Sequence, residues 1–517
     1  MTTSLGKLQI ENDKLNKKIL ILNESLITKN NKIKKLEKKL KDYDKEIEKK
    51  IENTVKKLYE KILIENNKLK EENANLKKLL NVTTSINLPT SKTPINEKKY
   101  IPNTREKSVN AKGGQTGHKK SKLEAFIDNE ITDTHIHEVT RCTCGCTNLV
   151  DLGIRITKDN YDIDIRVMKV RNEFHTYMCS NCNKKIDSPV PLNLKEENQY
   201  GNNLNALALS LINQGCVSFN RTKSLISGFT FDEVNMSEGY LVKLQKRASN
   251  KLESFINDLK VKIINEPVIN WDDTCIDIDK QKSCLRVYTT PKLALYTAHL
   301  QKGKKGVDED GILNNLTSKT TLVHDHNVLN YNDEYDFQNA ECCIHLIRDL
   351  NKLSLDLGHK WSKDLVTLLK KVNVERKQYI EDKLYFENKY IDEVINDYDL
   401  IITKGKKQNE NDFNKYFGND EKRILNRLIK YKENYLMWIT RFDIPFDNNL
   451  AERSLRMSKT KMKVSGQFAN INNARYYANI KSYIETCKRN NINEHIAITK
   501  LLNNDAYSID EILEKGL

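Results

Sequence analysis

The stretch Pro267-Val268-Ile269-Asn270-Trp271-Asp272-Asp273-Thr274-Cys275-Ile276 is an apolar run that carries two neighbouring carboxylates. Its β-branched and aromatic residues predict a strand. A central strand does not usually bury adjacent aspartates, so the pair indicates a functional site. Because side chains alternate along a strand, Asp272 and Asp273 should face opposite sides, and only one of them can belong to that site.

Further strands follow this first one. Residues 283–289 and 292–300 are strand-like, a helical stretch is expected near Gly311, and residues 320–326 form another buried-type run that ends beside Asp325. Three antiparallel strands, a helix and a fourth strand, with acids on the first and fourth, describe the ribonuclease-H-like fold. His324 and His326 flank Asp325, but strand alternation points them away from its side, so both are expected to be structural.

A third acid lies near the end of the chain, in the run Ile444-Pro445-Phe446-Asp447-Asn448-Asn449-Leu450-Ala451-Glu452-Arg453-Ser454-Leu455-Arg456. Asp447 can cap a helix that begins at Asn448. On that helix Glu452 shares a face with amides and cations, a combination that suits a metal and a phosphate together. Ordinary surface ion pairs are the alternative. In the ribonuclease-H-like fold the third acid arrives on a later helix, a position that Glu452 fits.

The composition indicates a polyanionic partner. The chain has 517 residues, and 86 Lys and Arg against 71 Asp and Glu give a formal charge of +15, which favours nucleic acid. The eleven cysteines follow no signal peptide, which predicts reduced intracellular thiols. Since no apolar run reaches the length of a membrane span, a soluble cytoplasmic protein is expected.

Residues 1–82 are predicted to form a coiled coil through which the chain self-associates. After Ile47 the apolar spacing changes to four and four, which predicts a stutter. A single amphipathic helix lying on the body is the alternative. The apolar seam, interrupted only by Lys29, consists of Leu15, Ile19, Leu22, Leu26, Ile33, Leu36, Leu40, Tyr43 and Ile47.

Residues 83–128 are a basic, Pro- and Gly-containing linker that ends near Lys119 and Lys120. It either orders on a DNA backbone or serves as an inert tether.

Residues 129–195 contain two cysteine groups on either side of a strand-like stretch at 161–170, a pattern that predicts a zinc ribbon. Cys179 and Cys182 form a conventional Cys-x-x-Cys knuckle. In the first group, Cys142 pairs with Cys144 or Cys146, or Cys144 pairs with Cys146, leaving one thiol over. A ribbon without metal, or a group of free thiols, is the alternative.

The remaining segments are expected to be helical. Residues 196–262 suggest a helical connector, with a weak helix-turn-helix signal. Residues 346–440 suggest a helical insertion broken at 404–407, and residues 474–489 a final helix that covers the sheet. His345 begins a helix with a leucine repeat, so a packing role is expected for it. After Glu452, a basic segment carries Lys459, Lys461 and Lys463.

Taken in order, these motifs resemble the insertion-sequence-66 transposase family of bacterial mobile elements over nearly the whole chain. Besides the coiled coil and the cysteines, the resemblance rests on Gly113-Gly114-Gln115-Thr116-Gly117-His118, Asp272-Asp273-Thr274, Cys342-Cys343-Ile344-His345, Asp447-Asn448-Asn449-Leu450-Ala451-Glu452-Arg453 and Tyr483-Ile484-Glu485-Thr486-Cys487-Lys488. The chain departs from the family at Asp273, where Glu is usual, at Cys343, where Trp is usual, and in its shortened first cysteine knuckle.

The resemblance implies a DDE-type transposase whose catalytic triad is Asp272, Asp325 and Glu452. Cys342 and His345 correspond to a Cys-x-x-His signature after the second acid. Two Mg²⁺ or Mn²⁺ ions would be held by the triad, with Asp272 bridging them. Water would free a 3′-hydroxyl at the element end, and that hydroxyl would then attack target DNA. The residues expected to hold DNA phosphates are Lys119, Lys120, Arg453, Arg456, Lys459, Lys461 and Lys463.

The implied partners are double-stranded DNA at the element ends and the target, a second copy of the chain, and element-encoded helper proteins, in the nucleoid-associated cytoplasm of a bacterium. The expected fold is multidomain α/β: a coiled coil at 1–82, a linker at 83–128, a zinc-ribbon-like β domain at 129–195, a helical domain at 196–262, a ribonuclease-H-like core at 263–345 and 441–517, and a helical insertion at 346–440. A catalytically inactive DNA-binding or assembly protein is the main alternative. A plain ribonuclease-H-type nuclease would not explain the coiled coil, linker and ribbon.

Overall fold

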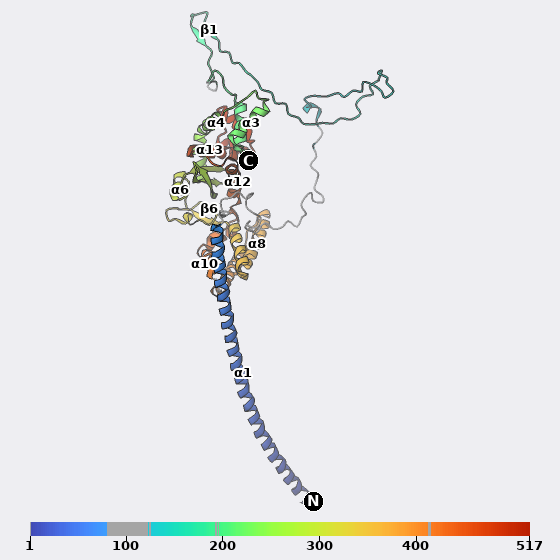
Figure 1. Cartoon of the computed structure of the whole chain (residues 1–517), viewed down its shortest axis with the longest axis vertical. Helices are drawn as coiled ribbons and strands as arrows, with labels where there is room; N and C mark the ends of the chain where they lie inside the picture. The colour runs from blue at the N-terminus through green and yellow to red at the C-terminus, as the bar shows by residue number, and fades with distance from the viewer. Residues whose placement is uncertain are drawn as a thin grey trace. The chain divides into compact units, whose positions relative to one another are not determined.

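The computed structural model describes residues 2–79, 123, 126–191, 194, 196–411 and 415–516. The chain is a multidomain α/β protein that divides into two compact units, the first formed by Met1–Pro102 with Lys406–Arg423 and the second by Asn103–Gly405 with Ile424–Leu517. In the part of the chain that the structure describes, no helix is both long and apolar enough to cross a bilayer. Figure 1 shows the helices and strands along the chain.

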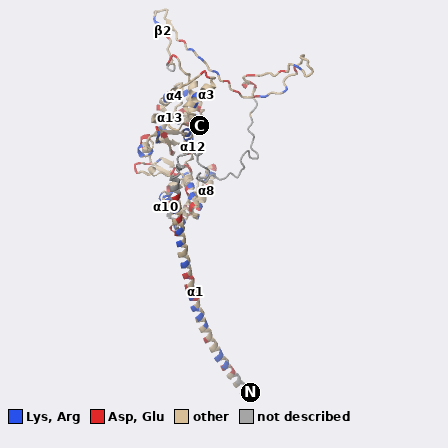
Figure 2. Cartoon of the chain, viewed as in Figure 1, with Lys and Arg blue, Asp and Glu red and all other residues tan. Residues whose placement is uncertain are grey.

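The first long element is α1, one continuous helix over Thr2–Leu79. The expected helix is therefore confirmed. Leu15, Ile33 and Leu40 of the apolar seam are 54%, 51% and 66% exposed within the single chain. Charged side chains of both signs are distributed along the helix (Figure 2). These three seam residues are therefore not buried within the single chain. Most of the linker, including Lys119 and Lys120, lies outside the described residues.

Four helices precede the sheet: α2 (Asn202–Asn213), α3 (Phe219–Phe229), α4 (Glu238–Asn250) and α5 (Glu253–Ile264). The hydroxyls of Ser218 and Ser237 accept backbone hydrogen bonds at the starts of α3 and α4, as N-caps do. The buried faces of these helices share one apolar core with Ile269 and Tyr288 of the sheet and Tyr483 of a later helix. This segment is therefore packed as part of the second unit.

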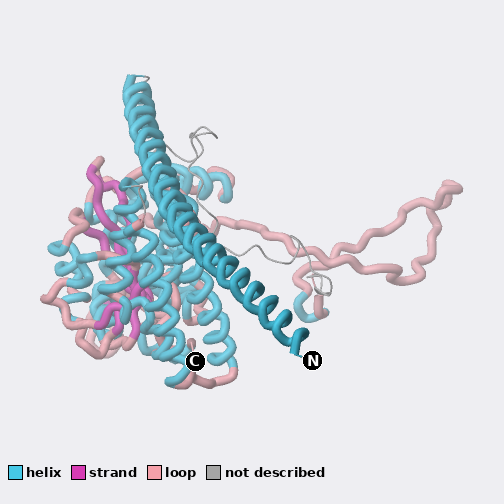
Figure 3. The backbone as a smooth tube through the Cα atoms, turned by 90° about the horizontal axis from the view of Figure 1, so that it is seen from below, coloured by secondary structure: helices cyan, strands magenta, loops and turns pink. Residues whose placement is uncertain are grey.

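The central sheet has five strands in the order β5-β4-β3-β6-β7. They are β3 (Val268–Ile278), β4 (Gln281–Thr289), β5 (Ala294–His299), β6 (Thr321–His324) and β7 (Gln338–Glu341). The strand β4 pairs antiparallel with both β3 and β5, whereas β6 pairs parallel with both β3 and β7. The strands of the sheet lie among the helices (Figure 3). The short α6 (Lys304–Asp310) ends at Gly311, as expected. The strand β7 was not expected, because four residues with one apolar side chain carry no strand pattern.

Two helices from the end of the chain pack on this sheet. They are α12 (Asn449–Ser465) and α13 (Ile471–Arg489), and α14 (Glu494–Leu502) and α15 (Ile509–Lys515) follow them. Ala451 and Leu455 of α12 and Tyr477 of α13 are buried with Ile276 and Val287 of the strands. The expected helix cover over the sheet is confirmed, and it brings the first turn of α12 to β3.

The segment between β7 and α12 is helical, as expected. It contains α7 (Cys343–Leu357), α8 (Lys360–Glu381), α9 (Asn388–Glu410), α10 (Lys415–Lys430) and α11 (Lys432–Thr440). The expected break at 404–407 is wrong, because α9 runs through Gly405. A Cβ atom there would lie 2.8 Å from Cδ2 of Trp361 and 2.9 Å from Cδ2 of Leu425. Glycine serves close packing here rather than helix termination.

The cysteine-containing region differs from expectation. The described strands there are β1 (Thr176–Met178) and β2 (Lys185–Asp187), an antiparallel pair around the second cysteine knuckle. The strand expected at 161–170 is not formed, and the segment belongs to a long loop (Figure 3). Ile163 and Val170 are 82% and 74% exposed. An alternating pattern forms a strand only when its apolar face packs on a second strand or on a core. In the described part of the chain no strand pairs with this segment, although Val167 packs against the core of the second unit.

Candidate active site

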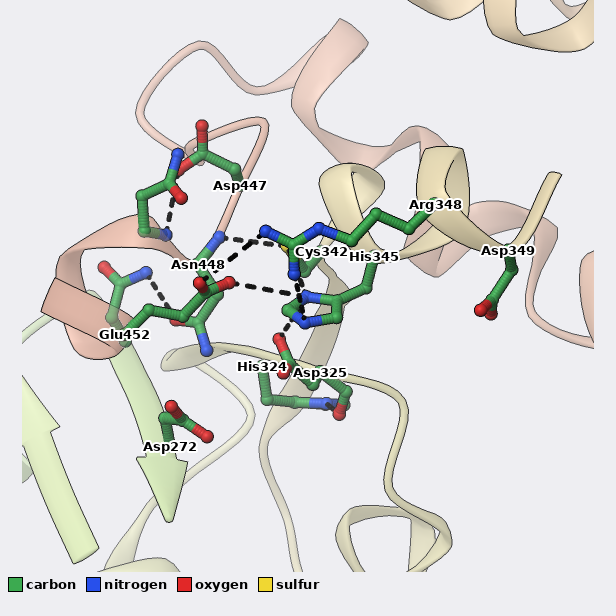
Figure 4. Close-up of polar contacts among 12 residues, drawn as sticks. Asp272, His324, Asp325, Cys342, His345, Arg348, Asp349, Asp447, Asn448 and Glu452 are labelled. Atoms are coloured by element: carbon green, nitrogen blue, oxygen red, sulfur yellow. Dashed lines mark hydrogen bonds and ion pairs between the residues drawn. The ribbon is translucent and has the colours of Figure 1, made fainter. Parts of the chain in front are cut away.

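Asp272 lies in the middle of β3, beside the first turn of α12 (Figure 4). Its Oδ1 accepts a hydrogen bond of 2.8 Å from the backbone N–H of Asp273. Burial and the charge of Asp325 raise the pKa of Asp272 to about 7, although that hydrogen bond and the charge of Lys459 act in the opposite direction. The side chain of Asp273 forms an ion pair of 2.7 Å with Lys302 instead. The two adjacent carboxylates therefore have different environments.

Asp325 follows the end of β6, and Glu452 lies in the first turn of α12. Between them lies the imidazole of His345, from the first turn of α7. Its Nδ1 is 2.9 Å from Oδ1 of Asp325 and 3.5 Å from Oε1 of Glu452. The packing role expected for His345 is therefore wrong. The leucine repeat does fill the buried side of α7, but His345 is on the side that faces the acids.

The environment of His345 favours its positive charge. Burial lowers the pKa of His345, but contacts with Asp325 and Cys342 outweigh this effect and raise the pKa to about 10. The Sγ atom of Cys342 is 3.4 Å from Nδ1, and Arg348 Nη1 is 3.0 Å from Nε2. A positive charge on this imidazole reduces the repulsion between the two carboxylates on either side of it.

Asn448 links the segments that carry these acids. Its side-chain amide donates to the carbonyl of Trp271 at 2.7 Å, its Oδ1 accepts from Asn270 at 3.0 Å, and its backbone N–H donates to Sγ of Cys342 at 3.2 Å. The side chain is completely buried. The one sign of this role in the sequence is the position of Asn448 one turn before Glu452.

His324 and His326 point away from the acids, as expected. His324 is buried, and its ring contacts the carbonyl of Asp325 at 2.7 Å and the side chain of Asn339 at 2.8 Å. His326 lies 2.6 Å from Oε1 of the buried Glu341, which also accepts a hydrogen bond of 2.6 Å from Tyr331. Both histidines thus fix the loop that carries Asp325. Glu341 could not be found from sequence, because its strand had no recognisable pattern.

The carboxylates are suited to a cation. Oδ1 of Asp325 and Oε1 of Glu452 are buried atoms, and neither accepts a hydrogen bond. The contacts of these two oxygens with Nδ1 of His345 are ion pairs whose geometry is not that of a hydrogen bond. Buried carboxylate oxygens without donors are costly unless a cation compensates them, and oxygen ligands are those that Mg²⁺ prefers. A site for a divalent ion beside Asp272 is therefore consistent with the donors present.

The basic residues after Glu452 fall into two groups. Arg453, Arg456, Lys459 and Lys463 are exposed on α12. Lys461, in contrast, is 5% exposed, and its ammonium donates to the carbonyl of Ile212 at 3.3 Å and lies 5.4 Å from the centre of the Tyr477 ring. Burial lowers its pKa to about 8. The expectation that Lys461 contacts DNA is therefore wrong, because its side chain points toward α2.

Four of the five cysteines of residues 129–195 lie in two separate local pairs, and Cys146 instead directs its thiol at the carbonyl of Asn148 at 3.7 Å. Gly145 turns the first segment, where the Cys142 carbonyl accepts from the Gly145 N–H at 2.8 Å, and contact with Cys144 lowers the pKa of Cys142. Contact with Cys182 lowers the pKa of Cys179 in the second segment. Among the described residues, these pairs are not joined into a group of three or more ligands.

The model of the family described as "Transposase IS66 family" matches residues 197–476. The match includes Asp272, Asp325, Cys342, His345 and Glu452. A search of the curated proteins finds no match.

Proposed function

The chain belongs to the IS66 family of transposases, and we propose that it cuts the ends of a mobile DNA element and joins their 3′-hydroxyls to target DNA. The observation that supports this most strongly is the convergence of three acids that are far apart in sequence. The charge of Asp325 contributes to the raised pKa of Asp272, and one imidazole lies 2.9 Å from Asp325 and 3.5 Å from Glu452.

The sheet topology supports a ribonuclease-H-like core. Three antiparallel strands, with two further parallel strands added beside the first, are the arrangement expected of that fold. In this proposal residues 263–345 and 441–517 form the catalytic core, and residues 346–440 are a helical insertion within it. The acids then lie on the first strand, after the fourth strand in the chain, and on α12.

Asp272, Asp325 and Glu452 would hold Mg²⁺ or Mn²⁺ in the active protein. Two bound ions would neutralise charge on the phosphate and activate the attacking oxygen. In the first reaction the oxygen of water bonds to phosphorus while the bond to O3′ breaks, which leaves a 3′-hydroxyl on the element end. In the second, that hydroxyl attacks a target phosphodiester and releases its 3′-oxygen. The exposed Arg453, Arg456 and Lys459 are suited to hold the DNA phosphates during both reactions.

The other segments would serve assembly on DNA. The open seam of α1 supports a homodimer or larger oligomer through residues 1–82, which would bring two element ends together. Residues 83–128, with Lys119 and Lys120, would follow the phosphate backbone, and residues 196–262 would carry further DNA contacts. Residues 129–195 would bind Zn²⁺ through Cys179 and Cys182 with two thiols of the first group. We also propose helper proteins encoded by the element and association with the nucleoid.

The test is Mg²⁺-dependent nicking of DNA that carries the element ends. Asp272→Asn keeps the shape of the side chain but removes its charge, so it should bind the ends normally and lose nicking by at least about a thousandfold. Asp273→Asn is the matched control, because that neighbour pairs with Lys302 and should leave nicking within about threefold of wild type.

Equal nicking by Asp272→Asn and wild type would overturn the proposal. If the unaltered chain binds the ends but never nicks them under any divalent ion, the inactive DNA-binding or assembly protein becomes the correct description.

A further inference from the structure

The candidate active site contains donors of two chemical kinds. Asp325, Cys342, His345 and Glu452 each offer one ligand atom, and these four atoms all lie within 4.8 Å of one another. Asp272 is not one of the four. Two donors are carboxylate oxygens, but the others are a thiol sulfur and an imidazole nitrogen, which Mg²⁺ does not select.

The spacing of these donors resembles a tetrahedral ion site. Zinc bonds of about 2.0–2.3 Å place neighbouring tetrahedral ligands about 3.3–3.6 Å apart. From Nδ1 of His345, the distances are 3.4 Å to Sγ of Cys342, 3.5 Å to Oε1 of Glu452 and 2.9 Å to Oδ1 of Asp325. Only small side-chain movements separate this arrangement from a closed four-ligand site.

We infer that Cys342, His345, Asp325 and Glu452 bind a thiophilic divalent cation of the Zn²⁺ class at a position that overlaps the proposed Mg²⁺ site. The four side chains alone supply the ligand atoms, so binding does not require the proposed function. Its consequence rests on the proposed function: an ion held there occupies carboxylates that Mg²⁺ needs, so zinc would inhibit nicking.

The surroundings of Cys342 favour a metal-bound thiolate. The side chain is 1% exposed, and the backbone N–H of Asn448 is 3.2 Å from its Sγ. A donor directed at sulfur stabilises the thiolate that a metal requires. Burial in turn keeps competing water away from the sulfur.

One contact opposes binding. An ion on Nδ1 leaves the ring proton on Nε2, where Arg348 now directs Nη1 at 3.0 Å. Two donors cannot face each other, so Arg348 must withdraw, which its 42% exposed side chain allows. Removing this guanidinium should therefore strengthen ion binding, whereas removing a ligand should abolish it.

The experiment titrates the full-length chain with Co²⁺ and records the thiolate-to-cobalt absorption band. The cysteines at 142–182 are proposed to bind such ions as well, so the quantity measured is the difference between wild type and Cys342→Ser. The serine hydroxyl can still accept a hydrogen bond from the backbone N–H of Asn448. We expect Cys342→Ser and His345→Ala each to lose one bound ion per chain. Arg348→Gln, which offers an oxygen to Nε2–H, should bind about tenfold more tightly. Cys275→Ser, at an exposed cysteine outside the group, should match wild type.

Identical titrations of wild type, Cys342→Ser and His345→Ala would overturn the inference. Asp272→Asn separates it from the proposed function, because that variant should lose nicking yet keep the full cobalt band. If the band is present while wild type never nicks DNA, the metal site stands and the transposase chemistry does not.

Discussion

Asn448 donates a hydrogen bond of 2.7 Å to the carbonyl of Trp271, the residue that precedes Asp272 on β3. Its position as the N-cap of α12 places it one turn before Glu452. One buried amide thus ties the strand of the first acid to the helix of the third. The hydrogen bond from its backbone to Cys342 extends the link to the start of α7.

The first prediction concerns this amide. Asn448→Ala removes both side-chain hydrogen bonds and leaves the Trp271 carbonyl and the Asn270 amide buried without partners, which should lower the free energy of unfolding by about 2–4 kcal/mol. Nicking should fall further than the loss of folded protein explains, because Glu452 is no longer fixed relative to Asp272. Urea unfolding together with nicking per folded molecule measures both effects. Asn449→Ala, at the partly exposed neighbour, should change unfolding by less than about 0.5 kcal/mol.

The second prediction concerns the pH dependence of stability at Lys461. The pKa of Lys461 is about 8 in the folded chain, against the ordinary lysine value of 10.5. Below pH 8 the Lys461 amine is charged in both the folded and the unfolded chain. The folded chain then carries the full free-energy cost of burying that charge. Between pH 8 and 10.5 the folded chain loses its proton first, so stability rises with pH, and above that window the cost is absent. Lys461→Met should therefore stabilise the protein at pH 7, by up to about 3 kcal/mol, and flatten this rise.

Urea unfolding at pH 7 and pH 9.5 checks the prediction. Lys463→Met, on the exposed side of the same helix, should leave both values unchanged. A destabilised Lys461→Met protein at pH 7 would show that the ammonium contributes more through Ile212 and Tyr477 than its burial costs.

The third prediction separates the lysines and arginines of α12 by their exposure. Arg456→Ala and Lys463→Ala should each weaken DNA binding similarly for all sequences and reduce the slope of log affinity against log salt by about 1. Lys461→Met should leave that slope unchanged, because its ammonium faces the protein interior. Fluorescence anisotropy on a DNA duplex at several salt concentrations gives the slopes. If the slope of log affinity against log salt were reduced in Lys461→Met but not in Lys463→Ala, the conclusion that Lys463 contacts DNA and Lys461 does not would be wrong.

The fourth prediction concerns self-association through α1. Leu36→Asp with Leu40→Asp places charges in the apolar seam, so the oligomer should dissociate to chains of 60.1 kDa. Sedimentation equilibrium measures the mass. Lys38→Asp changes charge away from the seam and should leave the oligomer intact. A wild-type chain that sediments as a monomer at micromolar concentration would exclude the coiled coil.

The fifth prediction concerns zinc at residues 129–195. Cys179→Ser and Cys182→Ser should each lower the zinc content by one ion per chain. Among Cys142→Ser, Cys144→Ser and Cys146→Ser, two should have the same effect and the third none, which identifies the spare thiol. Elemental analysis of proteins purified without chelator provides the measurement. Unchanged zinc in both second-knuckle variants would exclude the ribbon site.

Local patterns were sufficient to predict the strands β3 to β6 of the sheet and the helix of Glu452, but not β7. The run around Asp272 is apolar and β-branched, and the Pro445–Asp447 turn marks the start of α12, so each could be recognised within about ten residues. The different environments of Asp272 and Asp273 followed from strand alternation alone. These predictions needed no knowledge of distant contacts.

Distant contacts account for the features that sequence analysis missed or misjudged. Lys461 and Lys463 look alike in sequence, and only the carbonyl of Ile212, some 250 positions away, distinguishes them. Gly405 resembles a helix break in the sequence, but in the structure it allows close packing against Trp361. The alternating residues at 161–170 have no second strand to pair with in the described part of the chain. The leucine repeat of α7 suggested a packing role for His345. The repeat does not show on which side of the helix His345 itself lies.

The long helical insertion has a consequence for protein synthesis. Asp272 and Asp325 leave the ribosome well before Glu452, and five helices must be made in between. A growing chain can fold its earlier strands while still attached, since domains fold as they emerge, but it has no third carboxylate to complete the cluster. If the proposed chemistry is correct, no incomplete translation product can damage the chromosome of the cell that makes it.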